Sequence, residues 1–313
     1  MTIQSDNRNS NAVLRLGDAR IHCVEEWQGD YQLPQECFAG YDEVAFRKHA
    51  AAMAPNFYTP ATNHIYAFLQ SWVIEVDGLK ILYDTGVGND KIRPGLPIFN
   101  GFKTSFLERL EAAGFRPADI DIVICSHLHI DHVGWNTRLE GDRWVPTFPN
   151  ARYMFSKIDR DFFDPAGPGR RPNQMLAFGQ TNVFEDSVQP LLDAGIVDLV
   201  EPGDQLGKSI TFTPGHGHTP GQLVTELVSC GESALFVADI VHHPIQLYFP
   251  DWNSKYCDDQ GQARLTRWRV LEEAVERNTI LLPTHWGGVH CCRVRRAGGA
   301  FEPVFELGGK PWT

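Results

Sequence analysis

Alternating and continuous apolar runs along the chain predict strands that are joined by short polar turns. Residues 13–25 fit two strands around a Gly-Asp turn, and residues 65–83 fit a hairpin around Asp77-Gly78. Helical spacing of apolar residues predicts helices at 102–113 and 263–277 and an amphipathic stretch at 42–53. Further apolar runs predict strands at 121–125, 152–155, 196–200, 209–213, 222–228, 234–239 and 279–283. The pattern is typical of a mixed α/β protein.

Two features of the first half recur in the second. The segment VDGLKILYDTG leads a strand into Asp84, as SCGESALFVADI leads one into Asp239. Likewise, DIVICSH brings an apolar strand to His127, and TILLPTH brings one to His285. Such echoes indicate a duplicated β/α unit whose strand ends converge on one edge, where α/β proteins bind their ligands. We therefore expect a single domain over residues 1–313.

Residues 26–64 interrupt this regularity with scattered proline and aromatic residues. Long excursions of this kind often carry function, so we expect an insertion beside the site. It would serve as a lid or as the arm of a homodimer.

Composition narrows the classes of partner. The 313 residues include 28 Lys and Arg against 39 Asp and Glu, a formal net charge of −11 without any basic run. Nucleic acid is therefore an improbable substrate. The seven cysteines form no CxxC pair, which argues against a disulfide framework. We see neither a signal-like N-terminus nor an apolar run near the roughly 18 residues of a membrane span, and expect a cytoplasmic protein that binds no membrane.

Histidine is concentrated in one part of the chain. Nine of the twelve histidines lie between His127 and His290. Three of them, with Asp131, fall within residues 127–132, directly after a strand that is predicted to be buried. So many imidazoles cannot all be buried without partners, and imidazole with carboxylate suits zinc and related ions. In an extended loop His127 and His129 can face one ion, while Asp131 and His132 turn toward a second.

Three later residues extend this set. His216 lies between two glycines, and Asp239 and His285 each follow an apolar strand. Singly, they fit a loop histidine, a capping aspartate and a core histidine that has its own partner. Together with the first group they make five histidines and two aspartates, enough for two metal ions that share one carboxylate.

The ordered set, HxHxDH at 127–132, a later GHTPG, a strand-terminal Asp and a final strand-terminal His, resembles the metallo-β-lactamase-fold hydrolases over residues 13–306. The stretch ADIVHHPIQLYFPDW resembles their methyl parathion hydrolase and lactonase-like branch. The resemblance implies a four-layer αββα sandwich. It also implies these metal ligands: His127, His129 and His216 on one ion, Asp131, His132 and His285 on the other, and Asp239 between them.

The implied activity is hydrolysis of a carboxylic ester or lactone, such as an N-acyl-homoserine lactone or an aryl ester, by a metal-bridging hydroxide in a binuclear centre. Zinc is favoured over manganese, iron or cobalt. Phosphotriester hydrolysis is the alternative, since the same pair of ions accepts a phosphoryl group. A non-catalytic metal-binding protein is the third reading.

Other residues near the motifs have expected roles of their own. Asp131 would also orient the nucleophile or pass a proton. Lactonases of the fold often have a tyrosine soon after the bridging aspartate that assists the substrate carbonyl; here His242 or His243 would take that role, with His242 favoured and packing beneath the helix as the alternative. Asp84 would hold a ligand imidazole, or else stabilise its turn. His218 would cap the GHTPG turn. An aromatic pocket wall is expected from Trp135, Phe249 and Trp286, with core packing as the alternative for each.

Overall fold

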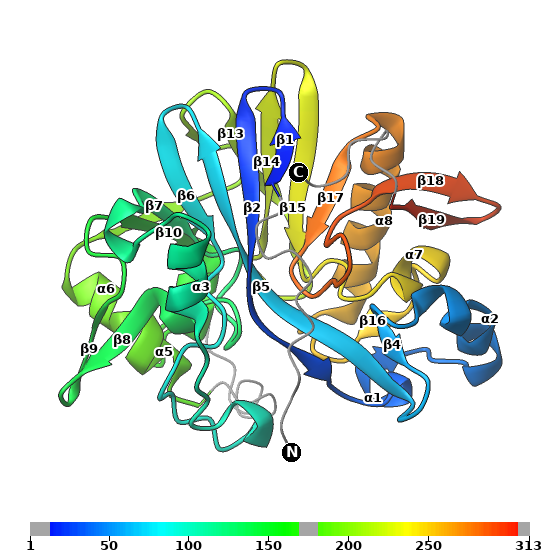
Figure 1. Ribbon diagram of the computed structural model, residues 1–313, viewed down its shortest axis with the longest axis horizontal. Coiled ribbons are helices and arrows are strands. Elements are labelled where there is room, and N and C mark those ends of the chain that lie inside the picture. Colours follow the sequence, from blue (N-terminus) through cyan, green and yellow to red (C-terminus); the bar gives the residue numbers. More distant parts are fainter. Residues whose placement is uncertain (1–12, 169–180, 306–313) are drawn as a thin grey trace.

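Two β-sheets form the centre of the molecule (Figure 1). The computed structural model describes residues 13–168 and 181–305. The larger sheet has the order β1-β2-β5-β6-β7-β10-β11, with β4 paired to β5. Its strands are β1 (Val13–Leu16), β2 (Ala19–Asp30), β4 (Tyr58–Thr59), β5 (His64–Val76), β6 (Leu79–Tyr83), β7 (Ile122–Ile124), β10 (Arg152–Ser156) and β11 (Val197–Val200).

The smaller sheet has the order β12-β13-β14-β15-β17. Its strands are β12 (Gln205–Leu206), β13 (Ile210–Pro214), β14 (Leu223–Ser229), β15 (Glu232–Ala238) and β17 (Ile280–Pro283). Three two-stranded ribbons complete the strands: β3 (Phe38–Ala39) with β16 (Asn253–Ser254), β8 (Thr137–Glu140) with β9 (Arg143–Pro146), and β18 (Arg293–Ala297) with β19 (Ala300–Val304).

Helices cover the outer faces of the two sheets (Figure 1). The α-helices are α1 (Pro34–Cys37), α2 (Glu43–Met53), α3 (Phe106–Ala112), α4 (Lys157–Phe163), α5 (Val183–Ser187), α6 (Gln189–Asp193), α7 (Ile245–Tyr248) and α8 (Gln260–Glu276). Short 3-10 helices lie at Pro97–Phe99, Pro117–Asp119 and Gly134–Asn136.

Three apolar clusters separate four layers, because successive side chains of a strand point to opposite faces of its sheet. Between the sheets, Ile74 and Ile81 of the larger sheet share a core with Phe236 of the smaller one. On the outer face of the larger sheet, Val73 shares a second core with Phe106 of α3. On the outer face of the smaller sheet, β14, β15 and β17 pack against α8 and α2. The αββα sandwich is confirmed.

The two halves repeat one strand arrangement. In the larger sheet, β5 and β6 form an antiparallel hairpin, and β6 then pairs in parallel with β7. In the smaller sheet, β14 and β15 form the hairpin, and β15 pairs in parallel with β17. The carboxyl ends of β6, β7, β15 and β17 lead into Asp84, His127, Asp239 and His285 respectively.

Some elements differ from the prediction. Strand β2 continues to Asp30, because a bulge between Glu25 and Trp27 in its pairing with β5 breaks the alternation that marks a strand in the sequence. The helix expected at 102–113 is limited to α3, and the β18–β19 hairpin was not predicted.

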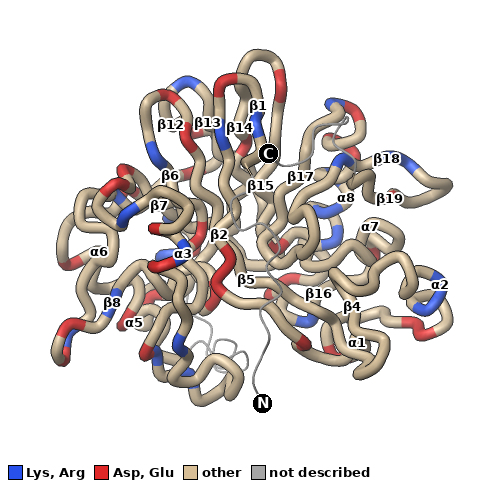
Figure 2. The backbone as a smooth tube through the Cα atoms, in the orientation of Figure 1, with Lys and Arg blue, Asp and Glu red and all other residues tan. Residues whose placement is uncertain are grey.

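Acidic and basic residues are interspersed over the surface elements (Figure 2). None of the helices in the described ranges is both long and apolar enough to cross a membrane.

The bulge in β2 turns Glu26 into the interior. Its carboxylate accepts hydrogen bonds from the backbone N–H of Val87 (2.6 Å) and Gly88 (3.1 Å) and from Nε1 of Trp135 (2.7 Å). Burial raises the pKa of Glu26 to about 7, although these hydrogen bonds oppose the shift. One buried carboxylate thus joins β2 to the loops that follow β6 and β7.

This carboxylate predicts a pH dependence of stability. The folded chain binds more protons at Glu26 than the unfolded chain does between about pH 4.5 and 7, so the free energy of unfolding should fall as pH rises through that window. Relative to Glu26→Gln, the wild type should lose about 2–3 kcal/mol between pH 5 and 8. Urea unfolding of both proteins at the two pH values measures this, and parallel pH profiles would contradict the assignment.

Candidate metal centre

The loop after β7 carries the first histidines and is held from both sides. Thr85 N–H donates a hydrogen bond to the carbonyl oxygen of His132 in this loop (2.8 Å). Gly134 N–H, also in the loop, donates one to the carbonyl oxygen of Gly86 (2.7 Å). A Cβ at Gly134 would lie 1.8 Å from the Val87 carbonyl oxygen, so only glycine allows this approach. The loop is therefore fixed against the end of β6.

Asp84 joins the same loop through its side chain. It has a left-handed backbone (φ 55°) directly after β6 and is fully buried. Its carboxylate accepts hydrogen bonds from Ser126 N–H (2.7 Å), from the Ser126 hydroxyl (2.9 Å) and from Nδ1 of His132 (2.9 Å). Asp84 holds a proton on Nδ1 of His132, so Nε2, which faces the interior, is the nitrogen that would bind a cation.

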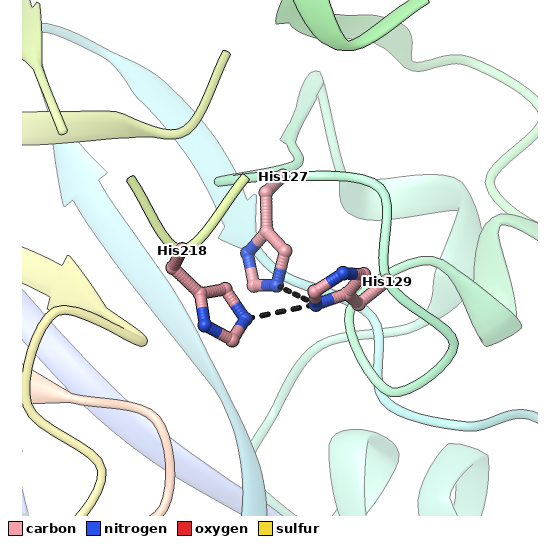
Figure 3. Close-up of side chains that lie close together, drawn as sticks. All are labelled: His127, His129 and His218. Carbon is pink, nitrogen blue, oxygen red and sulfur yellow. Dashed lines mark hydrogen bonds between the residues drawn. The ribbon is translucent and has the colours of Figure 1, made fainter. Parts of the chain in front are cut away.

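Three imidazoles converge in a first cluster (Figure 3). Nδ1 of His129 lies 3.1 Å from Nε2 of His127 and 2.8 Å from Nε2 of His218. The Ser126 hydroxyl donates its proton to Asp84, so it accepts one from Nδ1 of His127 (3.0 Å), which leaves a lone pair on Nε2 of His127. Burial, together with the neighbouring imidazoles, holds the pKa of His127 and of His129 well below the usual range. The neutral imidazoles of His127 and His129, aimed at one point with the ring of His218, fit a cation there.

A second cluster contains Asp131, His132 and His285. The carboxylate of Asp131 lies 3.6 Å from Nε2 of each histidine. His285 Nδ1 lies 3.0 Å from the carbonyl oxygen of Phe68, which can accept its proton, so Nε2 would be free to bind a cation. Nε2 of His132 has no hydrogen-bond partner among the described residues. A buried lone pair without a partner suits a metal ligand.

Asp239 lies between the two clusters. Its Oδ2 is 3.2 Å from Nε2 of His218, while its Oδ1 is 3.0 Å from Nε2 of His285 and 3.4 Å from Nε2 of His132. The preceding Ala238 has a left-handed backbone (φ 41°) beside a register shift in the pairing of β15 with β17. One oxygen thus faces each cluster.

The charge on Asp239 also governs the protons around it. Burial alone would raise the pKa of Asp239, but the imidazoles of His285 and His242 hold this pKa well below its usual range. Burial lowers the pKa of His218, but the Asp239 carboxylate outweighs this effect and raises that pKa to about 10. Divalent cations would supply the positive charge that these protons provide.

The expectation for His216 disagrees with the structure, which places His218 in the cluster instead. His216 is half-buried beside α8, where its carbonyl oxygen accepts a hydrogen bond from the Thr266 hydroxyl (2.7 Å). Between the two histidines, Gly217 has φ 128°, and a Cβ there would lie 2.2 Å from the backbone nitrogen of Ala263 in α8. The backbone turns at this glycine, and the ring of His218 lies among the imidazoles of the first cluster.

A cavity opens beside the two clusters. Its volume is about 810 Å³, counting the open space at its mouth. Six of the histidines and aspartates expected or found at the site line it: His129, Asp131, His218, Asp239, His242 and His285. Segment 26–64 supplies Trp27, Tyr31, Cys37 and Phe38 to its wall. The segment thus forms part of the cavity itself.

The three aromatic residues that were expected to form the pocket wall do not line this cavity. Trp135 stacks on Phe106 in the outer core of the larger sheet. Trp286 is fully buried and donates a hydrogen bond to Val241 O (3.1 Å), and Phe249 stacks on Trp252. They are next to site residues in sequence, but their side chains point into the cores. The wall that replaces them comes from distant segments, for which the sequence gives no local signal.

The comparisons with known proteins agree with this fold. The family model of the metallo-beta-lactamase superfamily matches residues 69–285, and the chain belongs to that superfamily. A comparison with curated protein sequences finds no significant match.

Among solved structures, the hydrolase AbOPH of the beta-lactamase superfamily superposes with a TM-score of 0.80 at 21% identity, over 96% of this chain and 98% of that one. AidC, a dizinc quorum-quenching lactonase solved with a product, superposes with a TM-score of 0.76 at 22% identity, over 96% of this chain and all of that one. At these identities the likeness supports the shared fold.

Proposed function

We propose that the protein is a binuclear metal-dependent hydrolase that cleaves a carboxylic ester or a lactone. The observation that carries this proposal is the placement of Asp239, whose two oxygens face separate clusters of ligand atoms. One cation would be held by His127, His129 and His218, and the other by Asp131, His132 and His285, with Asp239 shared. When bound, such a pair of cations lowers the pKa of water to about 7 and polarises a carbonyl oxygen.

The chain's own residues organise this centre. Asp84 and Ser126 fix the ring protons of His132 and His127 on the nitrogens that face away from the cations. Asp131, which faces the cavity, would also orient the attacking water. His242 lines the cavity with Nε2 3.0 Å from Asp239 Oδ2, and its Nδ1 has no hydrogen-bond partner among the described residues. The ring of His242 thus lies beside the cavity and Asp239, where it would contact a bound substrate.

The cavity favours a neutral, largely apolar substrate. Its wall contains apolar residues such as Ile65, Leu69, Leu96 and Phe99, and none of the described residues that line it is a lysine or an arginine. A lactone or ester with an apolar acyl chain matches such a wall, and binding would remove that chain from water.

A substrate panel with metal analysis tests the proposal. Purified protein should contain about two divalent ions per chain, and removing them with a chelator should abolish activity that added zinc restores. We expect turnover of N-acyl-homoserine lactones, simple lactones or aryl esters to exceed that of phosphotriesters by at least about 100-fold, although the same pair of cations could also polarise a phosphoryl oxygen. Fewer than one ion per chain, or activity that survives chelation, would contradict the binuclear proposal. A preference for phosphotriesters would contradict the ester and lactone assignment alone.

A further inference from the structure

Two tyrosines supply hydroxyl groups to the otherwise apolar part of the cavity wall. Tyr31 follows β2, and Tyr256 follows β16. Both side chains are half-buried, and their ring centroids are 6.4 Å apart. Both line the cavity that Asp131 and His285 of the second cluster also line. What these hydroxyls recognise bears directly on the substrate.

The backbone around Tyr31 is firmly held. Tyr31 N–H donates to Ile65 O (2.9 Å), and Ile65 N–H donates to Gln32 O (2.8 Å), so residues 31 and 32 extend the pairing along β5. The Tyr31 ring stacks on Phe99 with centroids 6.5 Å apart and an interplanar angle of 17°. The position of the hydroxyl is therefore set before a substrate binds, which lowers the entropy cost of using it.

Two hydrogen bonds of this pair run away from Tyr31. The Tyr31 hydroxyl donates to the Tyr256 oxygen (3.0 Å), and the Tyr256 hydroxyl donates to Oε1 of Gln32 (2.5 Å). The Cys37 thiol also points at Oε1 of Gln32 (3.7 Å), which supports that orientation of the amide. A phenol has a single proton, so the Tyr31 oxygen is left with lone pairs, and no described residue donates to it.

We propose that Tyr31 is a specificity residue whose oxygen accepts a hydrogen bond from an N–H group on the substrate. Building on the proposed function, the preferred substrate is a neutral lactone or ester that carries an amide N–H between its scissile ring or ester group and an apolar acyl chain. Simple lactones and aryl esters lack this donor. The apolar wall receives the chain, and Tyr31 distinguishes an acylamino substrate from one that is only apolar.

A matched pair of substrates tests this inference. One is N-hexanoyl-homoserine lactone, and the other is the analogue in which a CH2 group replaces the amide N–H. With the metal-loaded wild type, kcat/KM should be about tenfold higher for the amide. In Tyr31→Phe, kcat/KM for the amide should fall about tenfold, mainly through KM because the contact is made before and during reaction, while the analogue changes less than about twofold.

Tyr66→Phe is the matched control. It removes the hydroxyl of a tyrosine on β5 that does not line the cavity, and it should leave both substrates unaffected. Equal losses for the two substrates in Tyr31→Phe, or a wild type that does not distinguish them, would overturn the inference. If Tyr31→Phe fails to fold, the wild-type ratio alone decides the question. A wild type that hydrolyses aryl esters but neither of these lactones would also overturn the inference, whereas one that hydrolyses no ester or lactone at all would contradict the proposed function.

Discussion

Replacing Asp239 by alanine should lower kcat/KM for ester or lactone hydrolysis by at least about 1000-fold and reduce the metal content from about two ions per chain to one or fewer. Asp239 is the residue whose two carboxylate oxygens each lie within 3.2 Å of a ligand nitrogen, in different clusters. Its removal takes a ligand from both proposed ions and leaves buried imidazoles without the charge that they surround. Steady-state kinetics and elemental analysis of the purified variant measure the two effects.

Two further variants separate loss of charge from loss of fold. Asp239→Asn keeps the size and one oxygen but removes the charge, and it should also lose metal and activity. Asp251→Ala is the control: it removes an exposed carboxylate outside the cavity that accepts a hydrogen bond from Trp268. Its metal content and its activity should both stay at wild-type levels. An Asp239→Ala protein that keeps two ions and wild-type turnover would disprove the shared-ligand role.

The second large effect concerns two histidines that are separated by one glycine. His218→Ala should remove one proposed ion and lower kcat/KM by at least about 100-fold, because Nε2 of His218 lies 2.8 Å from Nδ1 of His129 within the first cluster. His216→Ala should retain both ions and nearly full activity, because that side chain is not part of any of the described clusters. The two variants remove the same chemical group from one loop, so each controls for the other.

A calorimetric titration of metal into the proteins, after a chelator has removed their metal, gives a readout that does not depend on turnover. His218→Ala should show one strong binding step fewer than the wild type, and His216→Ala should match the wild type. The opposite result, with metal lost only from His216→Ala, would restore the ligand set that the sequence suggests and contradict the placement of His218.

Most strands were predictable because they depend on patterns that are local in the sequence. The apolar runs before Asp84, His127, Asp239 and His285 all correspond to strands, and parallel pairing brings their carboxyl ends to one edge. The bulge at Glu26 breaks such a pattern, so the sequence predicted a strand that ends at residue 25, whereas β2 continues to Asp30.

The sequence alone thus determined the strands and most of the residues that gather at the candidate centre, because a strand followed by a polar ligand is a signal within a few residues. The sandwich itself was implied by the resemblance to the metallo-β-lactamase-fold hydrolases. Only the tertiary structure decided between His216 and His218, since the φ of Gly217 and its contact with α8 set which ring turns inward. It also decided the cavity wall. Aromatic residues beside the site residues in sequence turn into the cores, whereas Tyr31 and Tyr256, 225 positions apart, meet through a single hydrogen bond.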